Sequence, residues 1–175
     1  MTLDPHNSND EESGPTQSGT APPFLDSPSV SSIIEEMDEK RGAIISQLRS
    51  LTLSQQNVEE RALFDHFCRE WTPAYYVGRG QLFHVHNFRS GLRATMFMGA
   101  NTLAPFILAS EDASPELRDL VAETTGTGRV GQLRVSLASA EDVNEFMDLV
   151  RIKWHFLRKR QRPQKGGGEL TSRGV

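Results

Sequence analysis

Apolar side chains near the start of the chain recur with the period of a helix. Four of them stand seven residues apart: Val30, Met37, Ile44 and Leu51. Charged residues lie between them, so the pattern predicts a long amphipathic helix over residues 28–52, capped by Ser27. Its apolar face would pack against the rest of the domain or, as an alternative, pair with a second copy in a homodimeric coiled coil.

A second helix is expected over residues 57–71. Asn57 with Glu60 three residues later resembles a capping box, a sequence pattern typical of helix starts. The helix would bury four large side chains at helical spacing: Leu63, Phe64, Phe67 and Trp71. Thr72 and Pro73 would end it, because the residue before a proline disfavours helical geometry.

From Ala74 on, the pattern of apolar and polar side chains repeats every two residues, which predicts strands. Residues 78–80 form a turn, and residues 81–88 and 92–98 form a hairpin. A further strand is expected at residues 133–137, where apolar and polar side chains alternate. The segment 101–112 is expected to be a loop whose apolar side chains lie against the core.

Capping signals predict two helices in the second half of the chain. Ser114 begins a short helix that Gly126 closes, and Ser139 with Asp142 caps the last helix. The apolar stripe of this last helix comprises Val143, Phe146, Met147, Val150, Trp154 and Leu157. The order of elements predicts an α+β fold: a small, mainly antiparallel sheet of three to four strands, helices packed on one face, and the long amphipathic helix in front.

Composition divides the chain into one domain and two tails. Residues 1–26 are acidic and poor in large apolar side chains, which predicts disorder. Residues 27–160 are expected to form a single domain, followed by a flexible, basic and glycine-rich tail at 161–175. The start lacks the pattern of a signal peptide and Cys68 has no second cysteine to pair with, so we expect a cytoplasmic protein without membrane attachment.

Residues 126–131 match the glycine pattern of dinucleotide-binding loops by letter. That motif requires a strand before it and a helix after it, so that the helix N-terminus meets the phosphates. Here a helix is expected before the glycines and a strand after them. The match is therefore rejected, and no cofactor is expected.

His84 and His86 are the sharpest chemical feature of the sequence. Two residues apart on a strand, their side chains point to the same face and lie close enough to share a metal ion. The strand pattern supplies no third ligand, although His66, Cys68 or His155 could approach through the fold. The favoured interpretation is a pair of hydrogen-bonded histidines on a partly buried face, and a metal site is the alternative.

Two further surfaces are candidates for ligands. Five side chains could line a groove for an anionic or aromatic ligand: Tyr75, Tyr76, Arg79, Arg89 and Arg93. The candidate ligand-binding residues are Tyr76, Arg79 and Arg93 of this set together with His84 and His86. The last helix ends in a basic run that begins at Arg151 and Lys153. Three residues of this run could contact nucleic acid: Arg158, Lys159 and Arg160. Positive charge at a helix C-terminus also compensates the helix dipole, so ordinary solvated residues are the favoured interpretation of both sets.

The stretch from about residue 71 to residue 156 resembles a bacterial family known only as a domain of unknown function, numbered thirty-seven eighty-eight. The resemblance rests on four segments: the strand that begins at Tyr75-Tyr76, the hairpin over 81–99, residues 131–135 after a glycine turn, and the last helix from Glu141 to Lys153. It implies a compact α+β domain. It implies no activity or site, because the family has no assigned catalytic residues.

The sequence thus favours a non-catalytic module that binds a small molecule or a protein. No acid–base pair, activated nucleophile or phosphate loop is recognisable, so the chain leans away from an enzyme. The first alternative is a metal-binding protein or metal-dependent enzyme that uses His84 and His86. The second is a nucleic-acid-associated protein that uses the basic end of the last helix.

Overall fold

Five strands form one antiparallel sheet in the computed structural model, which describes residues 27–125 and 130–161. They are β1 (Val58–Asp65), β2 (Glu70–Val77), β3 (Gly80–Phe88), β4 (Gly91–Gly99) and β5 (Val130–Leu137). Each strand pairs with the next in sequence. The α+β class with a mainly antiparallel sheet is confirmed, but the prediction of three to four strands was wrong, since the described residues form five.

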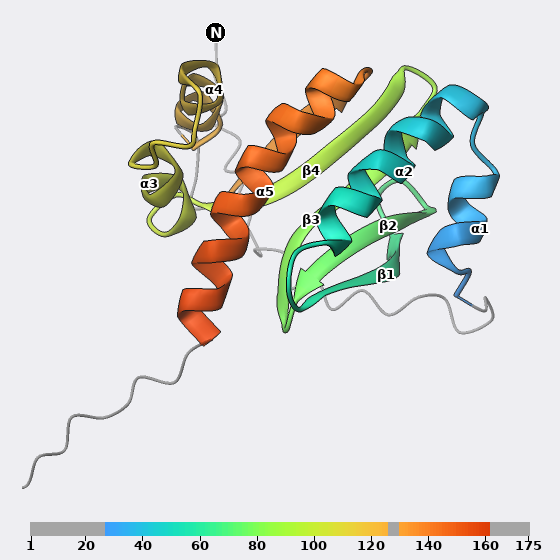
Figure 1. Cartoon of the computed structure of the whole chain (residues 1–175), viewed down its shortest axis with the longest axis horizontal. Helices are drawn as coiled ribbons and strands as arrows, with labels where there is room; N and C mark the ends of the chain where they lie inside the picture. Colours follow the sequence, from blue (N-terminus) through green and yellow to red (C-terminus); the bar gives the residue numbers. More distant parts are fainter. Residues whose placement is uncertain (1–26, 126–129, 162–175) are drawn as a thin grey trace, which may run out of the picture.

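The helices of the described residues are α1 (Val30–Glu35), α2 (Glu39–Leu53), α3 (Leu103–Leu108), α4 (Pro115–Thr125) and α5 (Ala140–Gln161). Helices α2 and α5 cross one face of the sheet (Figure 1), and they pack against each other. Helices α3 and α4 connect β4 to β5. Helix α3 packs against α4 and α5, and α4 packs against β5. None of these helices is both long and apolar enough to cross a membrane.

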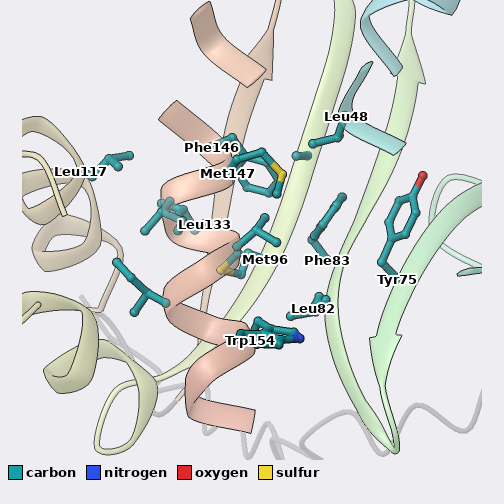
Figure 2. Close-up of a cluster of buried hydrophobic side chains, with 14 of the residues drawn as sticks. Leu48, Tyr75, Leu82, Phe83, Met96, Leu117, Leu133, Phe146, Met147 and Trp154 are labelled. Atoms are coloured by element: carbon teal, nitrogen blue, oxygen red, sulfur yellow. The ribbon is translucent and has the colours of Figure 1, made fainter. Parts of the chain in front are cut away.

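The core lies between the sheet and the two helices on it (Figure 2). Strand alternation directs Tyr75 and Phe83 toward the helices, where their ring centroids are 4.7 Å apart. The ring of Phe83 also meets Phe146 of α5 edge to face at 5.0 Å. Each of these three side chains is fully buried, and burial of a large aromatic side chain contributes about 2 to 3 kcal/mol.

Helix α5 follows its sequence prediction closely. The Oγ of Ser139 accepts a hydrogen bond from the backbone N–H of Asp142, and the Asp142 carboxylate accepts from Ser139 N–H in return. These bonds satisfy donors that a helix start leaves free. The predicted stripe is buried from Val143 to Trp154, and Leu157 is partly buried against the core.

The single long helix predicted over 28–52 is two helices in the structure. Ser29, rather than Ser27, caps α1 by accepting from Ser32 N–H at 3.0 Å. Asp38 then caps α2 by accepting from Arg41 N–H at 3.0 Å. An aspartate that accepts a backbone N–H favours a new helix start over continued helix. The apolar face of α2 is buried in its own domain through Ile45 and Leu48.

The helix predicted over 57–71 is wrong, because this segment forms β1, a turn and part of β2. Asn57 adopts a left-handed φ of 61° instead of capping a helix. Glu60 lies on β1 and pairs with Arg49 of α2, whose Nε is 2.8 Å from Oε2. Phe67, expected in the core, is 92% exposed at the turn. The spacing of large side chains fitted a helix, but it equally fits two strands that alternate.

Residues 101–112 contain α3, where the sequence predicted only a loop. Leu103 and Ile107 are buried, so the expectation that this segment lies against the core is confirmed. Ser114 starts α4 as predicted, since its Oγ accepts from Leu117 N–H at 3.2 Å. Gly126 lies outside the described residues, although α4 does precede and β5 does follow the glycine-rich segment.

Lys153 is buried although the sequence placed it in a basic, solvated run. Its ammonium donates to the backbone carbonyls of Leu82 at 2.8 Å and Phe97 at 2.9 Å. The pairing of β3 with β4 begins only at His84 and Thr95, so these carbonyls lie beyond its end. Lys153 therefore satisfies acceptors where two strands separate, and burial lowers its pKa to about 7.

Candidate metal centre

The turn between β1 and β2 fixes the orientation of Asp65. Its Oδ1 accepts hydrogen bonds from the backbone N–H groups of Phe67 at 2.7 Å and Cys68 at 3.0 Å. Arg69 completes the turn in a left-handed conformation with a φ of 56°. An aspartate that binds N–H groups two and three residues ahead is typical of a tight turn. The other oxygen, Oδ2, remains available to face the sheet.

Each ring nitrogen of His86 on β3 lies close to a carboxylate oxygen. Its Nδ1 is 2.8 Å from Oε1 of Glu70, and its Nε2 is 3.3 Å from Oδ2 of Asp65. His86 is only 4% exposed. On the side that faces the turn, its polar neighbours are therefore the carboxylates of Asp65 and Glu70. A carboxylate on one ring nitrogen fixes the ring and directs the other nitrogen toward a further partner.

His84 lies beside His86, as the two-residue spacing predicted. The centroids of the two rings are 4.8 Å apart, and His84 is 3% exposed. Its Nδ1 is buried and has no hydrogen-bond partner among the described residues. Burial and the neighbouring His86 lower the pKa of His84 to about 4, so the ring is neutral at neutral pH. A neutral imidazole with a free nitrogen is a competent metal ligand.

Three of these side chains converge as a ligand set. Each of Asp65, His84 and His86 offers one ligand atom, and these atoms lie within 4.8 Å of one another. Two ligands bound tetrahedrally to zinc at about 2.0 to 2.1 Å would themselves be about 3.3 Å apart. The distance of 3.3 Å between Nε2 of His86 and Oδ2 of Asp65 matches that separation.

A second ligand set overlaps the first and comprises Cys68, Glu70 and His86. Metals bind the thiolate form of cysteine. Burial raises the pKa of the Cys68 thiol, and the carboxylates of Asp65 and Glu70 raise it further. The second set is therefore the weaker one at neutral pH, and Glu70 is better placed as the group that orients His86.

The pKa of Asp65 suits a ligand that must be ionised. Burial alone raises it, but the backbone N–H groups of Cys68 and Phe67 and the two neighbouring histidines outweigh burial. The net pKa therefore lies below the usual range of an aspartate. Asp65 is therefore already ionised at neutral pH, as a carboxylate ligand of a metal must be.

Divergence of β2 from β3 makes room for this arrangement. The pairing of these strands begins at Ala74 and His84, so the first part of β2 lies outside it. Pro73 lies next to this end, and a proline cannot donate a ladder hydrogen bond. The turn that carries Asp65 and Glu70 can therefore approach the side of His86.

Sequence reasoning found the two histidines and missed both acids. Asp65 and Glu70 were assigned to a helix, and a helix would not have placed them across a turn from each other. The signal that could have been used was an aspartate, a residue type that favours turns, between two runs that also fit strands. Of the suggested third ligands, Cys68 lies in the second set, whereas His66 and His155 belong to neither.

The other predicted ligand residues are spread along the hairpin. Arg93 pairs with His86 across the sheet and lies with its guanidinium 5.8 Å from the ring centroid of Phe88. Tyr76 on β2 lies opposite Gln81, near the other end of β3, and the guanidinium of Arg61 is 4.8 Å from its ring centroid. Arg79 is exposed in the adjacent turn. Tyr75 faces the core instead. The structure thus groups Arg93 with the histidines and leaves Tyr76 and Arg79 apart.

The three basic residues proposed for nucleic acid lie at the end of α5, each over an aromatic ring of its own chain. Arg158 lies 4.6 Å from the centroid of Trp154, and Lys159 lies 5.1 Å from that of Phe106. Arg160 lies 5.5 Å from the centroid of Phe156. These contacts bind the cations to the domain, and nucleic-acid binding stays a prediction.

Comparison with protein-family models, curated proteins and solved structures found no match to this chain. The resemblance to the family of unknown function therefore stays a prediction. The candidate centre depends on its own geometry, on the chemistry of its donors and on the free nitrogen of His84.

Proposed function

We propose that this protein binds one divalent transition-metal ion through Asp65, His84 and His86. The observation that carries the proposal is the buried Nδ1 of His84, which has no protein partner in the described part of the chain. A buried polar atom without a partner costs about 1 to 3 kcal/mol, and a metal ion would remove that cost. The proposal favours the metal-binding alternative over the unspecified binding module.

The donor set favours zinc or iron(II) over calcium or magnesium. Two imidazoles and one carboxylate suit borderline transition metals, whereas calcium and magnesium prefer an all-oxygen shell. Three protein ligands leave at least one coordination position for water or a further ligand. Glu70 would act on the metal indirectly, because its hydrogen bond to Nδ1 holds the ring of His86.

Metal analysis of the full-length chain, purified without a histidine tag, tests the proposal. We expect one metal ion per chain by mass spectrometry, and one-to-one binding of Zn²⁺ by calorimetry after chelation. Asp65→Asn keeps the shape of the side chain and should weaken Zn²⁺ binding by at least tenfold. Glu70→Gln should weaken it by about 10- to 100-fold, the usual effect of removing a carboxylate that orients a ligand.

Two matched variants separate this site from metal binding by neighbouring side chains of the turn. His66→Ala removes an exposed histidine of the same turn and should leave Zn²⁺ affinity unchanged. Cys68→Ser should also leave it unchanged, because the favoured set excludes the thiol. A folded protein that carries no metal and binds none would refute the proposal, as would Asp65→Asn with full affinity. Circular dichroism checks that each variant is folded.

A further inference from the structure

A cleft separate from the metal ligands lies between α1 and the start of β2. Its volume is about 470 Å³, within the range of about 300 to 1,000 Å³ that small-molecule sites occupy. Ile33 and Met37 supply apolar walls, and the ring of Trp71 lines the same space. Trp71 is held in place by an edge-to-face contact with Phe64, with ring centroids 5.3 Å apart.

The polar groups of this cleft are acidic or neutral. Glu36, Glu70 and Asn87 line it, and none of the lining residues in the described part of the chain is basic. Glu70 directs Oε1 toward His86, and Glu36 forms no ion pair within the described ranges. The cleft therefore combines an aromatic wall with two carboxylates, and residues 27–125 and 130–161 contribute no lining cation to balance them.

Arg41 is the neighbouring guanidinium, and four of its five N–H groups already have partners. Its Nη1 donates to the side chain of Asn87 at 2.6 Å and to the carbonyl of Phe88. Its Nη2 donates to the carbonyl of Arg89, and its Nε lies 3.1 Å from Oδ2 of Asp38. Arg41 thus connects α2 to the turn after β3 through hydrogen bonds. None of these bonds goes to Glu36 or Glu70, the carboxylates of the cleft.

We infer that this cleft binds a small organic cation, an ammonium group attached to an apolar or aromatic body. The body would lie against Ile33, Met37 and Trp71, and the ammonium would pair with Glu36 and with the free oxygen of Glu70. Aromatic rings and carboxylates together are the usual surroundings of bound organic cations. The cleft shares Glu70 with the surroundings of the metal ligands, but Glu70 is not one of the three proposed ligands, and Glu36 and Trp71 belong to neither ligand set. Binding of the organic cation therefore does not require a bound metal ion.

Phenethylammonium chloride is a suitable probe, with 2-phenylethanol as its uncharged counterpart. The chain has two tryptophans, so its indole N–H signals in a proton–nitrogen NMR spectrum provide an internal control. Trp154 donates its indole N–H to the carbonyl of Gln56 at 2.9 Å and does not line the cleft. We expect phenethylammonium to shift the Trp71 signal with a Kd of about 1 mM or lower, and to leave Trp154 in place.

Glu36→Gln should weaken binding of phenethylammonium at least fivefold. Its matched control is Glu35→Gln, which makes the same charge change at the neighbouring exposed residue, the last of α1, outside the lining of the cleft. Equal affinity for 2-phenylethanol, equal effects of the two glutamine variants, or no shift of Trp71 at about 10 mM probe would each overturn the inference. Both variants lie on the surface, so their folding is not at risk.

Discussion

Replacing Lys153 with methionine should change how the stability of the domain depends on pH. The native ammonium is buried between α5 and the sheet, and its only hydrogen-bond partners among the described residues are the carbonyls of Leu82 and Phe97. No carboxylate in that part of the chain lies within ion-pair distance of it. Burial lowers the pKa from 10.5 to about 7, so the native state prefers the neutral amine.

The sign of the effect follows from proton binding. Between about pH 7 and pH 10.5 the unfolded chain keeps a proton on Lys153 that the native chain has released. Raising the pH therefore favours the native state by up to about 1.4 kcal/mol per pH unit. From about pH 7 to about pH 9 the free energy of unfolding should rise by about 2 kcal/mol relative to the variant. Below pH 7 the difference should become constant.

Urea unfolding of the wild type and of Lys153→Met at several pH values measures this difference. Other titrating groups contribute equally to both proteins and cancel. His84, whose pKa Lys153 also lowers, has a native pKa of about 4 and does not titrate in this window. Lys159→Met, an exposed position on the same helix, is the matched control and should show no pH-dependent difference. A wild-type minus Lys153→Met difference that stays flat up to pH 9 would refute the buried neutral amine.

Two further predictions concern single side chains. Tyr75→Phe should raise the free energy of unfolding by about 1 kcal/mol, because the buried hydroxyl of Tyr75 has no hydrogen-bond partner among the described residues. Thermal or urea unfolding measures this change. A clear loss of stability would show that the hydroxyl does have a hydrogen-bond partner. Gly42→Ala and Gly91→Ala should act in opposite directions, since a Cβ meets nothing within 4 Å at either position but Gly91 has a φ of 130°. Alanine should stabilise helical position 42 by about 0.5 to 1 kcal/mol and destabilise position 91 by about 1 kcal/mol or more, and equal signs would contradict this backbone argument.

Periodic patterns predicted the parts of the fold where one face alone meets the core. The stripe of α5 and the alternation in β5 gave correct elements because each buries one side. The hairpin of β3 and β4 was also predicted correctly, although β3 is buried on both faces from Leu82 to His86. The prediction for the segment 57–71 was wrong because its pattern did not distinguish a helix from strands. Its large residues fit both a helix and two strands, and Asp65, which forms the turn, was taken for an ordinary helical residue.

The same failure explains why only half of the candidate centre could be found in the sequence. His84 and His86 share a strand, so their proximity follows from a spacing of two. Asp65 and Glu70 reach them only through the β1–β2 turn, which is a tertiary contact that spacing does not encode. Lys153 was misassigned for a related reason, since a basic residue in a basic run gives no sign that its ammonium lies between strands.

The position of the candidate centre also indicates what a metal ion would do to the fold. Asp65 and the two histidines come from the β1–β2 turn and from β3, and these segments meet where the β2–β3 ladder has not begun. A metal bound by all three would join the turn to the sheet across that gap. Binding would therefore stabilise the native state and protect the turn most, because a ligand that binds only the native state adds its binding free energy to folding.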